Sequence, residues 1–308
     1  MTSEGKRFPL SAAAIAGTLE NIVTYPFEFV KTQMQLQVKG SSLYAGADKY
    51  AGPMDCVART LRASGVPGLY NGGKVFFLFA PPRALVRFNT FERLRDTAPS
   101  QRLRRQSPGG KRASDLLCGI GAGVADAAIC QTPCNQIQVK MVHDMAPKGP
   151  RRYRGLMHAV ASIKNEFGWW RGFYSGLAPT VAKVSFCAGI RFVGYGELAD
   201  QLRARPGRSG GADAPIAIWE SMAAGGVAGG ISAVASQPID VVRANIMGLD
   251  AKRYPSSLAC FMSILRGGGV SALYLGIGPR VCRVFAEEGL KFSLFELAER
   301  QLCKCFAR

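Results

Sequence analysis

The sequence predicts an all-α membrane protein with six transmembrane helices arranged as three pseudo-threefold repeats. Three observations predict this fold class. A proline motif recurs three times at nearly equal spacing, an aromatic–glycine motif follows each copy, and a small-residue apolar run precedes each proline. Because both sets of motifs recur in the same phase, the pattern indicates three copies of one unit of about 100 residues.

The proline motif marks the first long helix of each unit. Its copies are Pro26-Phe27-Glu28-Phe29-Val30-Lys31, Pro133-Cys134-Asn135-Gln136-Ile137-Gln138 and Pro238-Ile239-Asp240-Val241-Val242-Arg243. Proline removes one backbone hydrogen bond, so we expect each helix to be kinked there rather than ended. The repeats are placed at residues 1–105, 106–210 and 211–308, within one integrated transmembrane domain.

The aromatic–glycine motif precedes the second long helix of each unit. It reads Tyr70-Asn71-Gly72, Tyr174-Ser175-Gly176 and Tyr274-Leu275-Gly276. Between the two long helices, three segments have short helical amphipathicity, which is typical of helices that lie at a membrane interface. These segments are Met54–Ala63, His158–Phe167 and Leu258–Arg266.

The apolar runs are long enough to cross a membrane. Ser221 to Ile239 carries no charge over 19 residues, whereas Glu20 and Asp126 are the single charges that interrupt the two earlier runs. Charges interrupt the second helix of each unit more often, so a hydropathy scan alone would undercount the spans. A soluble helical repeat protein is the alternative, but its helices would be weakened by so much glycine.

Composition narrows the function classes. The net charge of +18 indicates an anionic partner, which could be nucleic acid, lipid headgroups or an acidic solute. Nine scattered cysteines without a Cys-x-x-Cys pair, together with only two histidines, argue against a metal site. No nucleophile–base set appears, so an enzyme is disfavoured. The stretch from Met1 to Pro9 is too short for a transit peptide, so we expect any organelle address to be internal.

A charged stripe follows the second helix of each repeat. Aligned on their tyrosines, these helices place side chains at i, i+4 and i+8, which share one helix face. The three sets are Phe79, Arg83 and Arg87; Lys183, Cys187 and Arg191; and Arg283, Glu287 and Lys291. Seven charges facing lipid would cost roughly 20 kcal/mol, so they should line a water-filled cavity that binds an anion. For Arg87, Arg191 and Lys291, snorkelling toward lipid headgroups is the alternative.

These motifs resemble the mitochondrial carrier family over nearly the whole chain. The resemblance rests on the Pro-x-[Asp/Glu]-x-x-[Lys/Arg] pattern, which the middle copy follows with Asn135 and Gln138 in place of the two charges, and on the glycine–aromatic–glycine pattern that follows each copy. Within the family, the stretches from Tyr25 to Leu36, Leu117 to Ala125, Val139 to Asp144 and Pro279 to Val284 are most similar to tricarboxylate (citrate) carriers. The resemblance implies six helices in the inner mitochondrial membrane, short amphipathic helices on the matrix side, and strict exchange.

The resemblance also implies a substrate class and a substrate site. We expect an antiporter that exchanges tricarboxylates or dicarboxylates, citrate-like and malate-like, by alternating access. The expected substrate residues are Arg83, Arg87, Lys183, Arg191, Arg280, Arg283, Glu287 and Lys291. Citrate carriers tend to carry amides around Val184, Cys187 and Ala188, and none is present here. A carrier of oxoglutarate, phosphate, a nucleotide or a sulfur anion therefore remains an alternative, and a basic nucleic-acid-binding protein is a more remote one.

The family pattern implies two gates. On the matrix side, each basic residue should meet the acid of the next motif, through Glu28, Lys31, Asn135, Gln138, Asp240 and Arg243. Arg243 can then meet Glu28, whereas Lys31 faces Asn135 and Asp240 faces Gln138, so one ionic pair of three survives. The expected cytosolic gate contains Glu92, Arg95, Glu296 and Arg300.

The remaining expectations concern ligands and partners. We expect no cofactor and no metal, but anionic lipid such as cardiolipin could bind at the helix starts near Gly72, Gly176 and Gly276. The expected partners are small carboxylate anions and membrane lipids, with no nucleic acid, and the expected functional form is a monomer.

Overall fold

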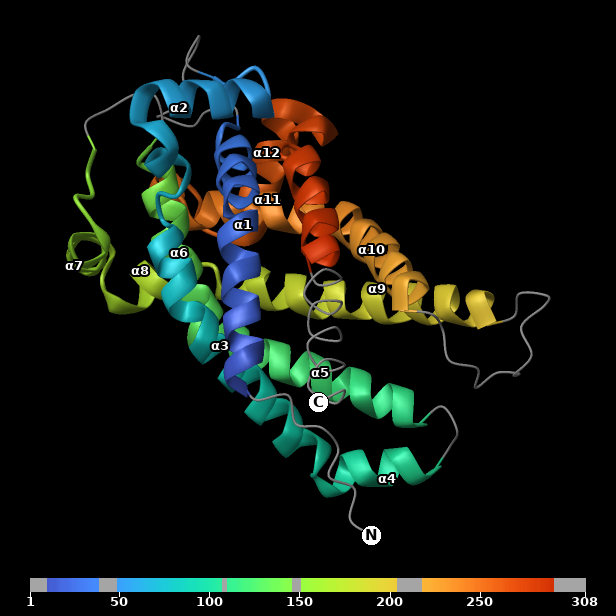
Figure 1. Ribbon diagram of the computed structural model, residues 1–308. Helices are drawn as coiled ribbons and strands as arrows, with labels where there is room; N and C mark the ends of the chain where they lie inside the picture. Colours follow the sequence, from blue (N-terminus) through green and yellow to red (C-terminus); the bar gives the residue numbers. More distant parts are fainter. Residues whose placement is uncertain (1–9, 39–48, 107–109, 146–150, 204–217, 291–308) are drawn as a thin grey trace, which may run out of the picture.

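The computed structural model describes residues 10–38, 49–106, 110–145, 151–203 and 218–290, and every regular element within these ranges is helical (Figure 1). Six long segments form the bundle. We number these segments 1 to 6 along the chain and define each by its helices below.

The odd-numbered segments contain the proline motifs. Segment 1 is the single helix α1, Leu10–Leu36, which continues through Pro26. Segment 3 consists of α5, Gly110–Asp126, a π-turn at Ala127–Gln131 and α6, Thr132–His143. Segment 5 consists of α10, Ile218–Ala235, and α11, Gln237–Met247. Pro133 and Pro238 therefore lie at the start of a new helix, as their missing N–H favours, whereas Pro26 lies inside one.

The even-numbered segments follow the aromatic–glycine motifs. Segment 2 is α3, Gly73–Arg95, segment 4 is α9, Leu177–Arg203, and segment 6 is the helix Ile277–Leu290. The polar helix α4, Ala98–Gln106, joins segment 2 to segment 3, and a 3-10 turn, Leu249–Arg253, follows segment 5.

Each repeat also contains the predicted short amphipathic helix. These helices are α2, Pro53–Leu69; α7, Leu156–Phe167, followed by α8, Trp169–Tyr174; and α12, Ser257–Ala272. Gly65, Gly168 and Gly269 interrupt them at equivalent points, with φ of +64°, +75° and +67°. Glycine adopts this left-handed conformation without a Cβ clash, so the same bend is repeated three times.

Three further glycines pack each repeat against the next. A Cβ at Gly72 would lie 3.2 Å from the Gln138 carbonyl oxygen in repeat 2. One at Gly176 would overlap Met247 Cε in repeat 3. The cycle closes in repeat 1, where a Cβ at Gly276 would lie 2.9 Å from the Lys31 carbonyl oxygen. The three repeats are thus joined head to tail around one axis.

The segments converge at one end and spread at the other. In Figure 1, α2 and α12 lie at the convergent end, whereas α5, α9 and α10 extend away from it toward the opposite end. We call these the closed end and the open end. By length and hydropathy alone, the described helices Ala113–His143 and Trp169–Leu198 qualify as spans, and Ser257–Ala272 with Ile277–Leu290 would add a third, bent by 72°. Charges inside segments 2 and 6 lower their hydropathy, as expected from the sequence.

Candidate anion-binding site

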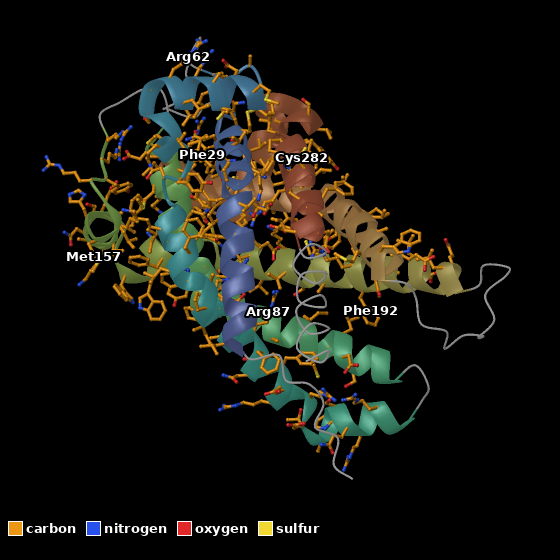
Figure 2. All side chains as sticks on the ribbon, in the orientation of Figure 1. Phe29, Arg62, Arg87, Met157, Phe192 and Cys282 are labelled. Atoms are coloured by element: carbon orange, nitrogen blue, oxygen red, sulfur yellow. The ribbon has the colours of Figure 1, made fainter. Side chains whose placement is uncertain are left out.

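A polar cavity of about 560 Å³ occupies the centre of the bundle. It shares Arg87, Gly119, Ala188 and Arg191 with a wider pocket of about 750 Å³, so the two form one continuous space toward the open end. Figure 2 labels Arg87 on α3 and Phe192 on α9, which both line the wider pocket. Phe29, also labelled there, is fully buried in the apolar core of the convergent half. The described charged residues of the stripe predicted on segments 2, 4 and 6 line this cavity, together with Cys187, whereas Phe79 packs against an apolar core cluster instead.

Asp240 of segment 5 is the hub of the cavity floor. Lys183 Nζ lies 2.6 Å from its Oδ1, and Lys31 Nζ lies 2.9 Å from its Oδ2. Arg280 and Arg243 complete the cluster at 3.2 Å and 3.3 Å. Because the Asp240 side chain is only 1% exposed, its charge is balanced by these cations rather than by water.

Glu28 of segment 1 forms a second, smaller cluster. Its carboxylate pairs with Arg283 of segment 6 and lies 3.4 Å from Lys31 Nζ. Arg283 also places its Nε 2.6 Å from Glu287 Oε1. Lys31 thus touches both acids and links the two clusters, which together close the cavity toward the closed end.

The expected pairing of the proline motifs is wrong in two respects. Lys31 was expected to face Asn135, but it reaches Asp240 in repeat 3. Arg243 was expected to meet Glu28, but its guanidinium contacts Asp240 of its own motif and donates to Thr180 Oγ1 at 3.1 Å. The physical reason is that Asn135 and Gln138 carry no charge, so Asp240 attracts cations from both sides. Asn135 and Gln138 themselves are buried, at 5% and 2% exposure.

Below the ionic clusters, three side-chain hydrogen bonds link the repeats in a ring. Gln33 Nε2 donates to the Val142 carbonyl at 2.6 Å, Lys140 Nζ to the Met247 carbonyl at 3.2 Å, and Asn245 Nδ2 to the Gln35 carbonyl at 3.0 Å. Each donor is seven residues after a motif proline, and each acceptor is nine residues after the proline of the next repeat. We call this the carbonyl ring. It joins repeat 1 to 2, 2 to 3 and 3 to 1, independently of the ionic pairs.

Toward the open end, Arg83 pairs with Asp126 of segment 3. Nε and Nη2 of Arg83 each lie 3.3 Å from one of the two carboxylate oxygens. One helical turn further along the stripe are Arg87 and, on segment 4, Arg191. Within the described ranges, no ion pair involves either of these two guanidinium groups, which both border the cavity.

The cavity has an excess of positive charge. Eight cations line it, and five acids either line it or pair with those cations, which leaves three positive charges. The stripe alone predicted a larger excess, because it omitted the acids of the odd segments. The cations are Lys31, Arg83, Arg87, Lys183, Arg191, Arg243, Arg280 and Arg283; the acids are Glu20, Glu28, Asp126, Asp240 and Glu287.

The other predicted site residues fall into two groups. Glu92 and Arg95 are exposed near the end of α3, on the side of the open end. Lys291, Glu296 and Arg300 lie outside the described residues. The predicted cytosolic gate is therefore described only in its repeat 1 half.

Sequence reasoning missed three contributors to the site. Asp126 was noted only as an interruption of an apolar run. Ser236 and Gln237 fix Arg280, whose Nη2 donates to Ser236 Oγ at 2.7 Å and whose Nη1 donates to Gln237 Oε1 at 2.8 Å. A lone acid in an otherwise apolar span is a signal that could have identified Asp126. No comparable signal distinguishes Ser236 or Gln237.

Comparisons with known proteins agree with this architecture. The family model described as mitochondrial carrier protein matches residues 9–101, 110–205 and 214–305. The mitochondrial tricarboxylate transport protein of Bos taurus is 35% identical over 305 residues, which cover 99% of this chain and 92% of the bovine protein. A putative mitochondrial tricarboxylate transport protein of Caenorhabditis elegans is 36% identical, covering 92% of this chain and 85% of the relative. Mitochondrial tricarboxylate transporter 1 of Mycosarcoma maydis is 31% identical, covering 92% and 91%.

Proposed function

Since the chain belongs to the mitochondrial carrier family, we propose that it is an inner-membrane antiporter that exchanges tricarboxylates and dicarboxylates, citrate-like and malate-like, by alternating access. The closed end is then the matrix side, because the short amphipathic helices of the family fold lie there. The open end faces the cytosolic side. Curated relatives that cover nearly the whole chain are named as tricarboxylate transport proteins, which supports this substrate class.

The observation that carries the proposal is the charge of the cavity. An excess of three positive charges surrounds a space of about 560 Å³, and a bound polyanion would balance it. Arg87 and Arg191 border the cavity from segments 2 and 4 without an ionic partner in the described part of the chain. A guanidinium group presents two parallel N–H donors that match a carboxylate, so these two arginines suit two carboxylates of one substrate.

The same geometry suggests how binding and gating are coupled. Lys183, Arg280 and Arg283 face the cavity but are held by Asp240 and Glu28. A carboxylate that reaches the floor competes with these acids for the same cations. Each contact it gains weakens the connection between an odd and an even segment, which lowers the barrier to opening the matrix side. Exchange is strict in this scheme because the empty cavity regains its acid–cation pairs and stays closed.

The proposal includes membrane partners. Anionic lipid headgroups would bind at the starts of the helices that follow Gly72, Gly176 and Gly276, where backbone N–H groups and the helix dipole attract negative charge. The transporter would act as a monomer, because the cavity is built from all three repeats of one chain. Nucleic acid is not expected as a partner, since the cavity cations are embedded in the bundle.

Exchange assays in liposomes test the proposal. Purified protein is reconstituted, the liposomes are loaded with unlabelled anions, and uptake of labelled citrate, malate, oxoglutarate, phosphate and a nucleotide is measured. We expect citrate and malate to exchange with one another, and we expect no uptake into unloaded liposomes. Protein-free liposomes and the Arg191→Ala variant are the controls. Uptake of phosphate or nucleotide in preference to both carboxylates would contradict the proposal and favour a carrier of another anion.

A further inference from the structure

The π-turn of segment 3 changes which residues of that segment face the cavity. Gly123 and Gly229 have equivalent neighbours: a Cβ at Gly123 would lie 2.6 Å from Val184 Cγ1, and one at Gly229 would lie 3.0 Å from Val284 Cγ1. The two valines occupy the same position after their aligned tyrosines. Yet Gly123 is ten residues before its motif proline and Gly229 is nine. Segment 3 thus contains one extra residue, and the π-turn at Ala127–Gln131 accommodates it.

This extra residue brings Asp126 to the cavity. Counted back from the motif prolines, Asp126 corresponds to Ile231, which is 53% exposed on the outer face of segment 5. One residue on a helix corresponds to about 100° of rotation, so the π-turn places Asp126 at the position of Ser232 instead. Ser232 lines the cavity and is 1% exposed, as is Asp126. Segment 1 has Glu20 at the equivalent position, and it also lines the cavity.

The partner of Asp126 is equivalent to the partner of Ser232. Ser232 Oγ donates to the Cys187 carbonyl at 3.4 Å, and Cys187 is thirteen residues after Tyr174. Arg83 is thirteen residues after Tyr70 and gives two donors to Asp126. The same layer of the bundle therefore contains a neutral contact between segments 4 and 5 but an ion pair between segments 2 and 3.

We infer that Asp126 is a positioning residue that holds one edge of the Arg83 guanidinium and so limits the charge that the cavity offers to a substrate. The inference rests on the carboxylate exchange proposed above. Arg83 has a side chain that is 22% exposed, against 2% for Asp126, so Arg83 alone can reach a substrate in the cavity. While Asp126 neutralises it, Arg83 adds little attraction for a third carboxylate. The pair thereby sets the preference between trivalent and divalent substrates, and it prevents the trivalent one from being held too tightly for release.

Substitution of either partner tests this role. In Asp126→Asn, Arg83 keeps its charge without a carboxylate, so the KM for citrate should fall at least about threefold relative to that for malate, and the maximal rate for citrate should fall too. Asp126→Glu, which keeps the charge, should retain the wild-type ratio. In an Arg83→Gln background, Asp126→Asn should cause no further change in the ratio, because the two residues act as one unit. Asp96→Asn, an exposed acid at the end of α3, is the matched control.

A second variant keeps the test decisive if Asp126→Asn does not insert. Asp126→Ser gives this position the neutral side chain of the equivalent Ser232, so it also frees Arg83 from a carboxylate and should shift the citrate-to-malate KM ratio in the same direction. An unchanged ratio in Asp126→Ser, or an equal change for both anions in Asp126→Asn, would overturn the role of Asp126. Wild-type protein that exchanges neither anion would overturn the proposed function instead, so the two failures are distinguishable.

Discussion

The ammonium group of Lys183 lies 2.6 Å from Asp240 Oδ1, so a cation of segment 4 is bound to the acid of the third proline motif. Lys183 belongs to the stripe expected to bind substrate, yet in this state it helps to seal the cavity toward the closed end. Arg280 and Arg283 also have both roles: each lines the cavity, and each is paired with an acid, Arg280 with Asp240 and Arg283 with Glu28. Residues of the floor should therefore respond to mutation differently from Arg87 and Arg191.

The first prediction concerns this hub. Asp240→Asn leaves four cations clustered around a neutral side chain, and breaking a buried ionic cluster from one side costs about 3–5 kcal/mol. We expect a clear fall in the melting temperature of the purified protein and loss of exchange. Differential scanning fluorimetry in detergent, with Asp96→Asn as control, measures the effect. A melting temperature equal to that of the control would mean that Asp240 does not hold the matrix side closed.

The second prediction separates binding from gating among the arginines. Arg191→Ala removes a guanidinium group without a described ionic partner, so it should raise the KM for citrate about tenfold or more, equivalent to about 1.4 kcal/mol, with little change in melting temperature. Arg283→Ala also removes the pairs with Glu28 and Glu287, so it should lower both transport and stability. Measuring the KM for citrate and the melting temperature of both variants separates the two roles. Two variants with the same stability loss would contradict the separation.

The third prediction concerns the carbonyl ring. Gln33→Ala and Asn245→Ala each remove one side-chain hydrogen bond between repeats, which is worth about 0.5–1.5 kcal/mol; the Val142 carbonyl keeps the Met145 N–H as a donor. We expect similar losses of stability from both, and less than their sum from the double variant, because one broken link already opens the ring. Labelling of Cys187 by a thiol reagent from the matrix side should increase. Gln101→Ala, at an exposed position on α4, is the control. Fully additive losses would show that the links act independently.

The fourth prediction tests the head-to-tail packing of the repeats. Gly276 has φ of +78°, and a Cβ there would lie 2.9 Å from the Lys31 carbonyl oxygen, a backbone atom. In Gly276→Ala, the left-handed backbone alone should lower the free energy of unfolding by about 1–2 kcal/mol. The contact between the new Cβ and the Lys31 carbonyl oxygen should lower it further. Gly278→Ala lies two residues away with open space around it, and should be neutral. The difference in melting temperature between these two variants is the measurement, and equal values would contradict the close approach of segments 6 and 1.

The repeat architecture could be predicted from the sequence because it depends on residues whose physical role is local. The glycines that bend the short helices recur at matching points. The helix was expected to continue past each motif proline, and α1 does run through Pro26, whereas Pro133 and Pro238 lie in the first turn of new helices. All three predicted amphipathic segments lie inside α2, α7 and α12.

The pairing inside the cavity could not be predicted in the same way. Aligning the three motifs assumes that the basic residue of each motif pairs with the acidic residue of the next. Lys31 pairs with Asp240 of repeat 3 instead, because the residue at the acidic position of repeat 2 is Asn135. Asp126 was overlooked for a different reason. A π-turn has no signature in a pattern with a period of 3.6 residues, so alignment on the prolines places Asp126 beside the outward Ile231 rather than with the cavity residues.

The carbonyl ring also constrains how the chain is made. Its last link joins Asn245 to the Gln35 carbonyl across 210 positions of sequence, so it cannot form until the third repeat has been synthesised and inserted. Contacts of such long range form late and slow the final stage of folding. A nascent chain with two repeats can form only the link from Gln33 to Val142, which leaves the Gln35 carbonyl and the Lys140 ammonium without partners in the ring. Such an intermediate lacks a complete seal at the closed end, so this barrier is completed only by the last segments of the chain.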